Sequence, residues 1–382
     1  MTASDADAPM ADRPEGFPFD SDYYRGVLLE YTLTAVLLAA FHFSGASASL
    51  AAGATRWTGG RWWLANAVYI VVALLGVAAA VFPVHWARAR RLAAALDGTG
   101  AGWTGLYTRV ITGDAALTFA FFNATYALLR WTPHRWWMIA AALYAAFAVV
   151  APALLPWLAQ PRLYQPRPLG HPELERRLRA LAGRAGHPLI RVGVWEEDDS
   201  ANFPPVLLAG TRRDSLILSA RLASEFPPEE IEALVARKFA RVRQRHVMMT
   251  VIIGTTLSAA AFVSVHFAGS EALRRLGPHP VTDARDIAGF PLLALAIMAA
   301  SGVALPALRA LRRAQTYSAD AFAARWTSAA TLESALRRLA GQPAPLPRWI
   351  EWLFSEQPAL ERRIRRLREA GAAGSERPAR LP

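Results

Sequence analysis

The sequence predicts a mainly α-helical protein that crosses a membrane several times and carries one small α+β insert between its membrane helices. Three observations predict this class. Of the 382 residues, 53% are hydrophobic and only 19% are charged, and the mean hydropathy is +0.19. The apolar residues also gather in blocks of about 20, the length that a helix needs to cross a bilayer. A water-soluble globular enzyme is therefore excluded.

Six apolar blocks predict about six transmembrane helices, at about 26–43, 62–84, 113–129, 136–158, 247–268 and 287–308. Tryptophans such as Trp62, Trp131 and Trp157 stand near the block ends, where amphipathic rings favour the headgroup region. The blocks divide the chain into a disordered N-terminal tail at 1–22, a four-helix membrane region at 23–160, an insert at 161–246, a membrane hairpin at 247–309, a helical C-terminal part at 310–370 and a disordered tail at 371–382.

Arginines in the short connections predict the orientation. The connection between the second and third blocks is the richest, with Arg88, Arg90, Arg91 and Arg109, whereas two connections on the opposite side hold two arginines each. Because positive residues favour the cytoplasmic side, we expect a cell-membrane protein with both termini and the 161–246 insert in the cytoplasm. Arginines of the last hairpin oppose this bias, namely Arg274, Arg275 and Arg285.

The 161–246 insert has the pattern of a folded unit. A helix is predicted over 172–186, since Leu174, Leu178 and Leu181 share one face. Short β-prone runs follow at 189–195, 206–208 and 215–218. A second helix opens at Pro227, with acidic residues in its first turn, and we expect it to continue into the fifth membrane block.

Composition excludes several kinds of chemistry. The chain has no cysteine, so it has no disulfide, thiolate metal site or cysteine nucleophile. The net charge is +12, and Lys238 is the one lysine among 42 lysines and arginines. The aromatic residues lie in the membrane belts and are not interleaved with basic residues, so the bilayer is an expected partner and a nucleic acid is not.

Short motifs in the second half of the chain occur in a distinctive order. They are His187–Val192, Ala201–Phe203, Pro228–Ala236, Tyr317–Ala323, and Ser355–Pro358 followed by Arg363–Ile364. This order resembles the membrane-embedded HExxH zinc metalloproteases of the HtpX and CAAX prenyl protease type. The resemblance covers about 170–370 and implies a gluzincin-like fold for the insert and the C-terminal part.

The resemblance also identifies the positions where the family holds zinc. Such a site needs two histidines one helical turn apart, a glutamate between them and a later glutamate ligand. In the matching register, Arg237, Lys238 and Arg241 stand in the HExxH segment. Thr316 stands at the later glutamate, and Gln357 stands at a histidine of the late motif. The motif is therefore predicted to be degenerate, with no catalytic residue, no metal ligand and no zinc cofactor.

Four further residues belong to the expected chamber. The resemblance places Asn202 near a sheet edge that takes an extended substrate, and it places Arg363 facing the chamber. His246 matches a family histidine that is not a ligand. Asp320 is the nearest retained acid, so we expect Arg237 or Arg241 to form an ion pair with it.

The residues leave three functions open. The first is a catalytically inactive homologue, a pseudoprotease that binds or regulates a membrane protein or a hydrophobic peptide. The second is a membrane enzyme or binding protein whose arginine-lined chamber takes an anionic, lipidic substrate. The third is a protein that would be grouped with metallopeptidases by domain similarity alone, although the ligands are missing.

Overall fold

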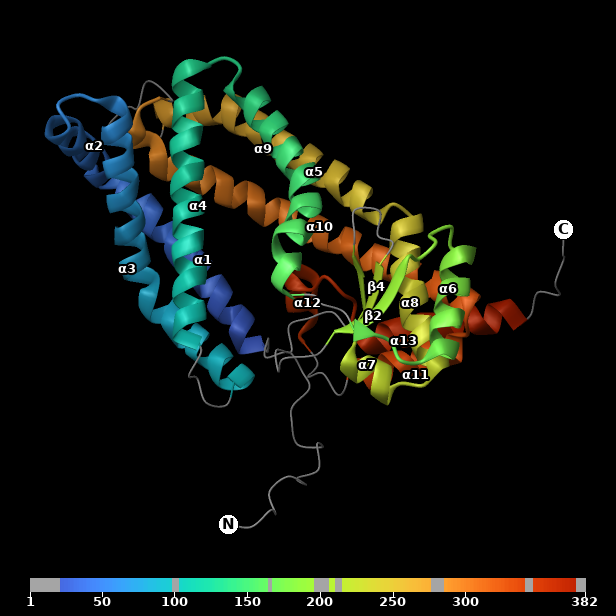
Figure 1. Ribbon diagram of the computed structural model, residues 1–382. Coiled ribbons are helices and arrows are strands. Elements are labelled where there is room, and N and C mark those ends of the chain that lie inside the picture. Colours follow the sequence, from blue (N-terminus) through green and yellow to red (C-terminus); the bar gives the residue numbers. More distant parts are fainter. Residues whose placement is uncertain are drawn as a thin grey trace, which may run out of the picture.

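The computed structural model describes residues 21–97, 103–163, 167–195, 206–209, 215–275, 285–340 and 346–375. The molecule is mainly helical and has one small mixed sheet. Figure 1 shows long helices gathered on one side and the sheet with its shorter helices on the other. Most of the two predicted terminal tails lies outside the described residues, but residues 21–22 are part of helix α1 and residues 371–375 are part of helix α13, so the predicted disorder is wrong at these positions.

Six long helices contain the six predicted apolar blocks. They are α1 (Ser21–Phe43), α3 (Trp62–Asp97), α4 (Trp103–Trp131), α5 (Trp136–Leu163), α9 (His246–Arg275) and α10 (Phe290–Trp326). Within the described residues, four of them, α1, α3, α9 and α10, contain segments long and apolar enough to cross a membrane. Spans in α4 and α5 stay predictions, because the described apolar part of α5, Trp136–Val150, is shorter than a span requires.

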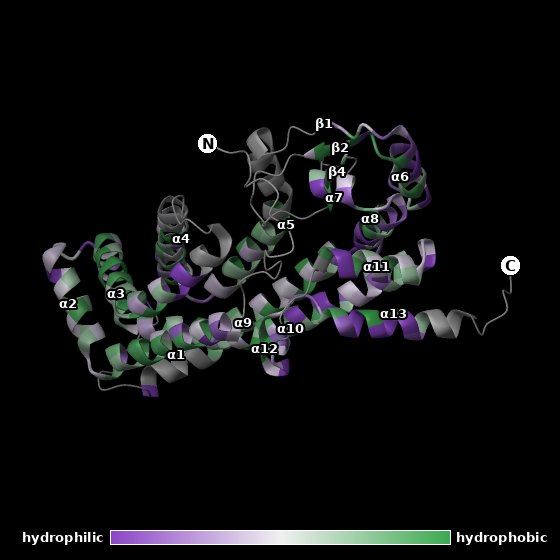
Figure 2. Cartoon of the chain, turned by 90° about the horizontal axis from the view of Figure 1, so that it is seen from below, coloured by the Kyte–Doolittle hydropathy of each residue, from purple (hydrophilic) through white to green (hydrophobic). Residues whose placement is uncertain are grey.

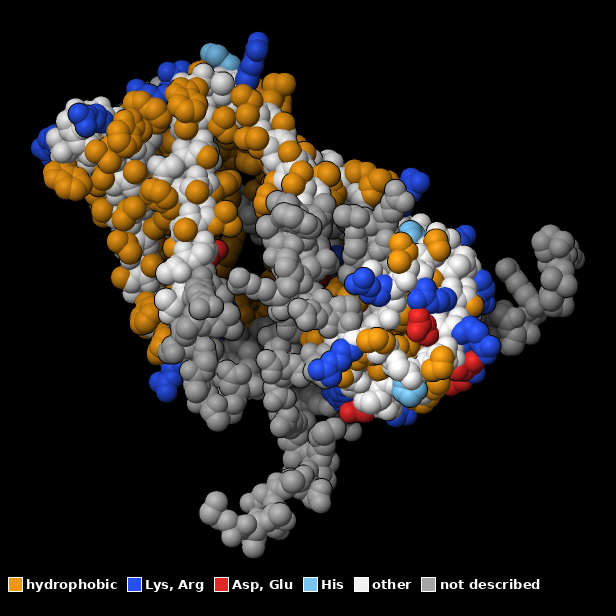
Figure 3. Space-filling view, viewed as in Figure 1, with side chains coloured by type: hydrophobic (Ala, Val, Ile, Leu, Met, Phe, Trp, Pro, Cys, Tyr) orange, Lys and Arg blue, Asp and Glu red, His pale blue; other side chains and the backbone are white. Residues whose placement is uncertain are grey.

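The long helices carry apolar side chains on their outer surface. Leu75, Phe147 and Val303 are each more than half exposed, and Figure 3 shows hydrophobic side chains spread over these helices while charged groups gather over the sheet-containing part. In Figure 2, α1 and α3 are mostly hydrophobic, whereas α6 and α13 carry many hydrophilic residues. An apolar outer surface of this kind suits contact with lipid.

Between α1 and α3 lies α2 (Ala46–Trp57), which the sequence did not predict because its Ala and Ser residues show little apolar contrast. It begins after Gly45, whose φ of 78° is left-handed. The Ser47 hydroxyl donates to the carbonyl of Ala288 at 2.7 Å and lies 2.6 Å from the Tyr69 hydroxyl. Helix α2 is thereby joined to α3 and to the 3-10 turn η2 (Ile287–Gly289).

The remaining elements form the sheet-containing domain. They are β1 (Arg167–Pro168), α6 (Pro172–Arg184), β2 (Arg191–Trp195), β3 (Val206–Ala209), β4 (Ser215–Ser219), α7 (Ala220–Glu225), α8 (Pro228–Arg243), α11 (Ala329–Ala340), α12 (Arg348–Phe354) and α13 (Leu360–Ser375). The strand order is β1-β2-β4-β3, with β2 parallel to β4 and the other pairs antiparallel. The predicted first helix and three strands are confirmed. Strand β1 and helix α7 were too short to be recognised from their sequence.

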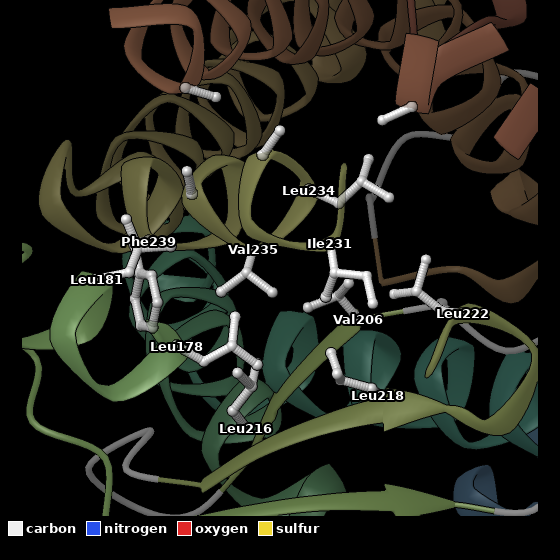
Figure 4. Packing of buried hydrophobic residues seen from close by; sticks show 14 of the residues in the cluster. Leu178, Leu181, Val206, Leu216, Leu218, Leu222, Ile231, Leu234, Val235 and Phe239 are labelled. Atoms are coloured by element: carbon white, nitrogen blue, oxygen red, sulfur yellow. The ribbon is translucent and has the colours of Figure 1, made fainter. Parts of the chain in front are cut away.

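Helix α8 is the centre of this domain. Its Ile231, Val235 and Phe239 are almost fully buried, and Figure 4 shows them facing side chains of α6 and β4. Burial of each such side chain contributes roughly 1.5–3 kcal/mol. On its other side α8 packs against α10 and α11, so it lies between the sheet and the helices that follow the membrane hairpin.

The expectation that this helix runs on into the fifth membrane block was wrong. Helix α8 ends at Arg243, and Arg245 adopts a left-handed φ of 50° before α9 begins. Side chains of α10 hold the break: Ser318 donates to the Gln244 side chain at 2.7 Å, and Gln315 donates to the carbonyl of His246 at 3.0 Å. The chain turns here because the apolar face of α8 packs on the domain core, whereas α9 enters the set of long apolar helices.

Candidate functional site

Small residues bring α8 and α10 close together. Ala240 on α8 and Ala319 on α10 are both fully buried and share one hydrophobic cluster with Phe322. Side chains this short allow two helix backbones to approach closely. Neighbouring polar positions of the two helices, Arg237 and Asp320, are therefore within contact distance.

Asp320 accepts hydrogen bonds from two arginines. Arg237 Nε donates to its Oδ1 at 2.7 Å. Arg363 Nε donates to Oδ2 at 2.7 Å, and Arg363 Nη2 donates to Oδ1 at 3.0 Å. The side chains are 4% exposed for Asp320, 7% for Arg363 and 13% for Arg237. The expected ion pair with Asp320 is confirmed for Arg237, and the bridge joins α8, α10 and α13.

The two other cations of the expected chamber, Lys238 and Arg241, lie on α8 beside this bridge. Both are partly buried, and within the described residues neither has a carboxylate at ion-pair distance. Burial, together with the charges of Arg241 and Arg237, lowers the pKa of Lys238 to about 8. Burial also lowers the pKa of Arg241, while the nearby charge of Asp320 opposes that shift.

The pKa of Arg237 falls to about 10, first because of burial and then because of the charge of Arg363, although Asp320 acts in the opposite direction. Asp320 therefore lies close to three cationic side chains, those of Arg237, Arg241 and Arg363, and Lys238 lies near two of them. The sequence alone missed Arg312, which lies close enough to lower the pKa of Arg241 further. Its position on α10, one turn before Thr316, was the available signal.

The other predicted site residues are placed differently. Thr316 is buried and donates to the carbonyl of Arg312 at 3.0 Å, within its own helix. His246 is buried at the start of α9, where burial and the charge of Arg241 lower the pKa of its ring. Gln357 is exposed and does not join the bridge. Asn202 lies outside the described residues, although β3, which follows it, is an edge strand of the described sheet.

The donor set does not fit zinc. A protonated guanidinium has no lone pair to give a metal, and both oxygens of Asp320 already accept hydrogen bonds from arginines. Across the described ranges, no group of three His, Cys, Asp or Glu side chains could hold a metal ion. The absence of zinc from the protein itself stays a prediction.

Residues 168–371, more than half of the chain, match the profile of peptidase family M48. The chain belongs to peptidase family M48. It is 27% identical over 230 residues to a protease HtpX homolog of Ralstonia pickettii (strain 12J), which covers 53% of this chain and 75% of that protein. It is 26% identical over 230 residues to a protease HtpX homolog of Acaryochloris marina (strain MBIC 11017), with 53% and 73% covered.

A solved structure of another protein has a fold similar to that of this M48 protein. The crystal structure of S. mikatae Ste24p matches with a TM-score of 0.64 at 16% identity, over 79% of this chain and 76% of that one. At this identity the match shows the fold alone. The long apolar helices and the HtpX homologues identify the chain as a multi-pass membrane protein of the M48 family.

Proposed function

We propose that this M48 protein is a pseudoprotease, which binds a membrane protein or a hydrophobic peptide without zinc-dependent cleavage. The carrying observation is the buried bridge from Arg237 through Asp320 to Arg363. It occupies the junction of α8, α10 and α13, and two of its three groups are guanidinium cations, which repel a divalent metal ion. A zinc ion here would meet one carboxylate and three cationic side chains, those of Arg237, Arg241 and Arg363.

The family register supports this proposal. In it, Arg237 and Arg241 stand at the two histidine positions of HExxH, and Lys238 stands at the glutamate that would activate water. The bridge would then replace the structural contribution of the metal. It links α8, which carries the degenerate motif, to α10, which carries the position of the later ligand. The HtpX homologues are named proteases, which points to a protein or peptide as the bound partner.

Elemental analysis of the protein purified in detergent tests the proposal. We expect no stoichiometric zinc and no chelator-sensitive cleavage of an unfolded membrane protein. One zinc per chain, removed by a chelator together with a proteolytic activity, would show that the proposal is wrong.

A rebuilt variant tests the register in the same assay. Arg237→His, Lys238→Glu, Arg241→His and Thr316→Glu together restore the family's ligand types, and we expect the combined variant to bind one zinc. The matched control carries the same changes except Thr316→Glu, and it should bind zinc at least about tenfold more weakly because it lacks one ligand. Equal zinc affinity in the two variants would show that Thr316 is not at the ligand position.

A specific observation favours a second function. Lys238 and Arg241 keep their charge partly buried with no acidic partner among the described residues. A binding protein or enzyme with an anionic, lipidic ligand would use such groups. The two functions differ in the ligand that they require, so copurifying peptide and copurifying phospholipid, identified by mass spectrometry, distinguish them.

We also propose the membrane orientation that the arginine distribution predicts. Both termini and the sheet-containing domain would lie in the cytoplasm. The support is the run Arg88, Arg90 and Arg91 near the end of α3, against fewer arginines on the opposite side.

A further inference from the structure

We infer that Lys238 and Arg241 form a binding site for a phosphate group. The inference deepens the proposed function, because it rests on the chamber holding no zinc, and it assigns the anion that the chamber takes. Either of two sources could supply this phosphate group: a phospholipid headgroup or free inorganic phosphate.

The geometry begins with the neighbouring bridge. Arg237 and Arg363 supply all the hydrogen bonds that the structure shows on Asp320, three in number. Asp320 is therefore engaged with other cations, and Arg241 feels its charge without being bonded to it. The positive charges that no carboxylate of the described residues pairs with are therefore those of Lys238 and Arg241, which take no part in the bridge.

Those two residues are placed to act together. Lys238 and Arg241 are three positions apart on α8, so their side chains are neighbours on one helix face. Their partial burial excludes much of the water that would otherwise screen them. Holding two like charges close together in this environment is costly without a counterion. An anion bound between them would attract both cations and so offset their repulsion and part of their desolvation cost.

A phosphate group fits the two donors better than a single-charged halide. The guanidinium of Arg241 can offer a planar pair of N–H groups to two phosphate oxygens, and the ammonium of Lys238 can bind a third as a point charge. The arginines of the bridge, 237 and 363, raise the positive potential without having to turn toward the ligand.

The site lies close to the membrane-spanning part of the chain. The candidate span of α9 begins at Met248, seven residues after Arg241, and Arg312 on α10 lies near Arg241. A headgroup phosphate at the membrane surface could therefore reach the site, as could a phosphate from solution. The test needs one arm for each source.

The composition provides a selective probe. Since Lys238 is the one lysine of the chain, reductive methylation followed by peptide mass spectrometry measures the reactivity of a single side-chain amine. The detergent is dodecyl maltoside, which carries no phosphate. We expect millimolar inorganic phosphate to slow the modification of Lys238 at least about tenfold, while chloride at equal ionic strength leaves it unchanged.

The lipid arm compares micelles doped with phosphatidic acid and with diacylglycerol, which differ by the phosphate alone. Protection by phosphatidic acid at lower concentration than by inorganic phosphate identifies the headgroup as the ligand source, and the reverse order identifies free phosphate. Equal protection by diacylglycerol and phosphatidic acid would overturn the inference.

Variants separate the site from general charge effects. Arg241→Gln should abolish protection, whereas Arg241→Lys, which keeps the charge, should retain part of it, and a melting curve of each variant confirms folding. Protection that persists undiminished in folded Arg241→Gln would overturn the inference. A second outcome would also overturn the inference. It is that the Lys238 amine is protected in the absence of phosphate and becomes reactive when four acidic residues are changed to amides, namely Glu196, Glu197, Asp198 and Asp199, which lie outside the described residues. Carboxylates of the protein itself would then be the anions bound by Lys238. Zinc analysis of the same samples tests the proposed function separately.

Discussion

Arg363 contacts both carboxylate oxygens of Asp320, with Nε 2.7 Å from Oδ2 and Nη2 3.0 Å from Oδ1. This two-point contact leaves room on Oδ1 for the third bond, from Arg237. Residues far apart in the sequence thus meet at one acid, and three helices of the domain are joined through it. The consequences for stability can be tested one group at a time.

Removal of the acid should strongly destabilise the protein. In Asp320→Ala, two buried guanidinium groups lose their counterion, and we expect a loss of about 3–5 kcal/mol in the free energy of unfolding. The matched control is Glu361→Gln, which removes the acid of a solvent-exposed pair with Arg337 and should cost less than about 1 kcal/mol. Thermal unfolding in detergent measures both, and similar melting temperatures for the two variants would show that the bridge contributes little.

Lys238 should make stability depend on pH. Its pKa is about 8 in the folded protein, below the value of about 10.4 for an unfolded chain. Between these values the unfolded state binds more protons, so stability should rise with pH across that window, by up to roughly 3 kcal/mol. In phosphate-free buffer near neutral pH, Lys238→Met should therefore be more stable than the wild type. The difference should vanish above about pH 10.5, where the amine is neutral in both states; a difference that is independent of pH would contradict this.

At position 245, in the break between α8 and α9, glycine should give a protein at least as stable as arginine does. Arg245 has a φ of 50°, a conformation in which a side chain is strained and glycine is not. We expect Arg245→Gly to leave stability unchanged or to raise it by up to about 1 kcal/mol. Arg365→Gly, at an exposed position inside α13, is the control and should cost about 1 kcal/mol. A loss in Arg245→Gly as large as in the control would show that Arg245 is held by contacts of its side chain.

Membrane orientation can be measured with reporter fusions. A fusion at the C-terminus and one near Thr282, between α9 and α10, should report opposite sides of the membrane, because α10 would separate them. We expect the C-terminal reporter in the cytoplasm. Reporters on the same side would show that the pair α9 and α10 does not form a membrane hairpin.

The sequence by itself determined the elements whose signal is local. Blocks of about 20 apolar residues predict helices wherever they occur, and α1, α3, α9 and α10 confirm this. The spacing of Leu174, Leu178 and Leu181 predicted the buried face of α6, and the order of short motifs indicated the family. These features depend on neighbouring residues or on a fixed order along the chain, so no knowledge of the packing is needed to recognise them.

Tertiary structure alone decided how the charged groups are paired. Sequence register predicted that Asp320 would attract Arg237 or Arg241, but the choice of Arg237, and the two bonds from Arg363, follow from how closely α8, α10 and α13 approach one another. The end of α8 at Arg243 was likewise hidden, because polar groups of α10 hold the turn. An ion pair or a helix break of this kind depends on residues tens of positions away, and their distances are set by the packed core and not by local periodicity.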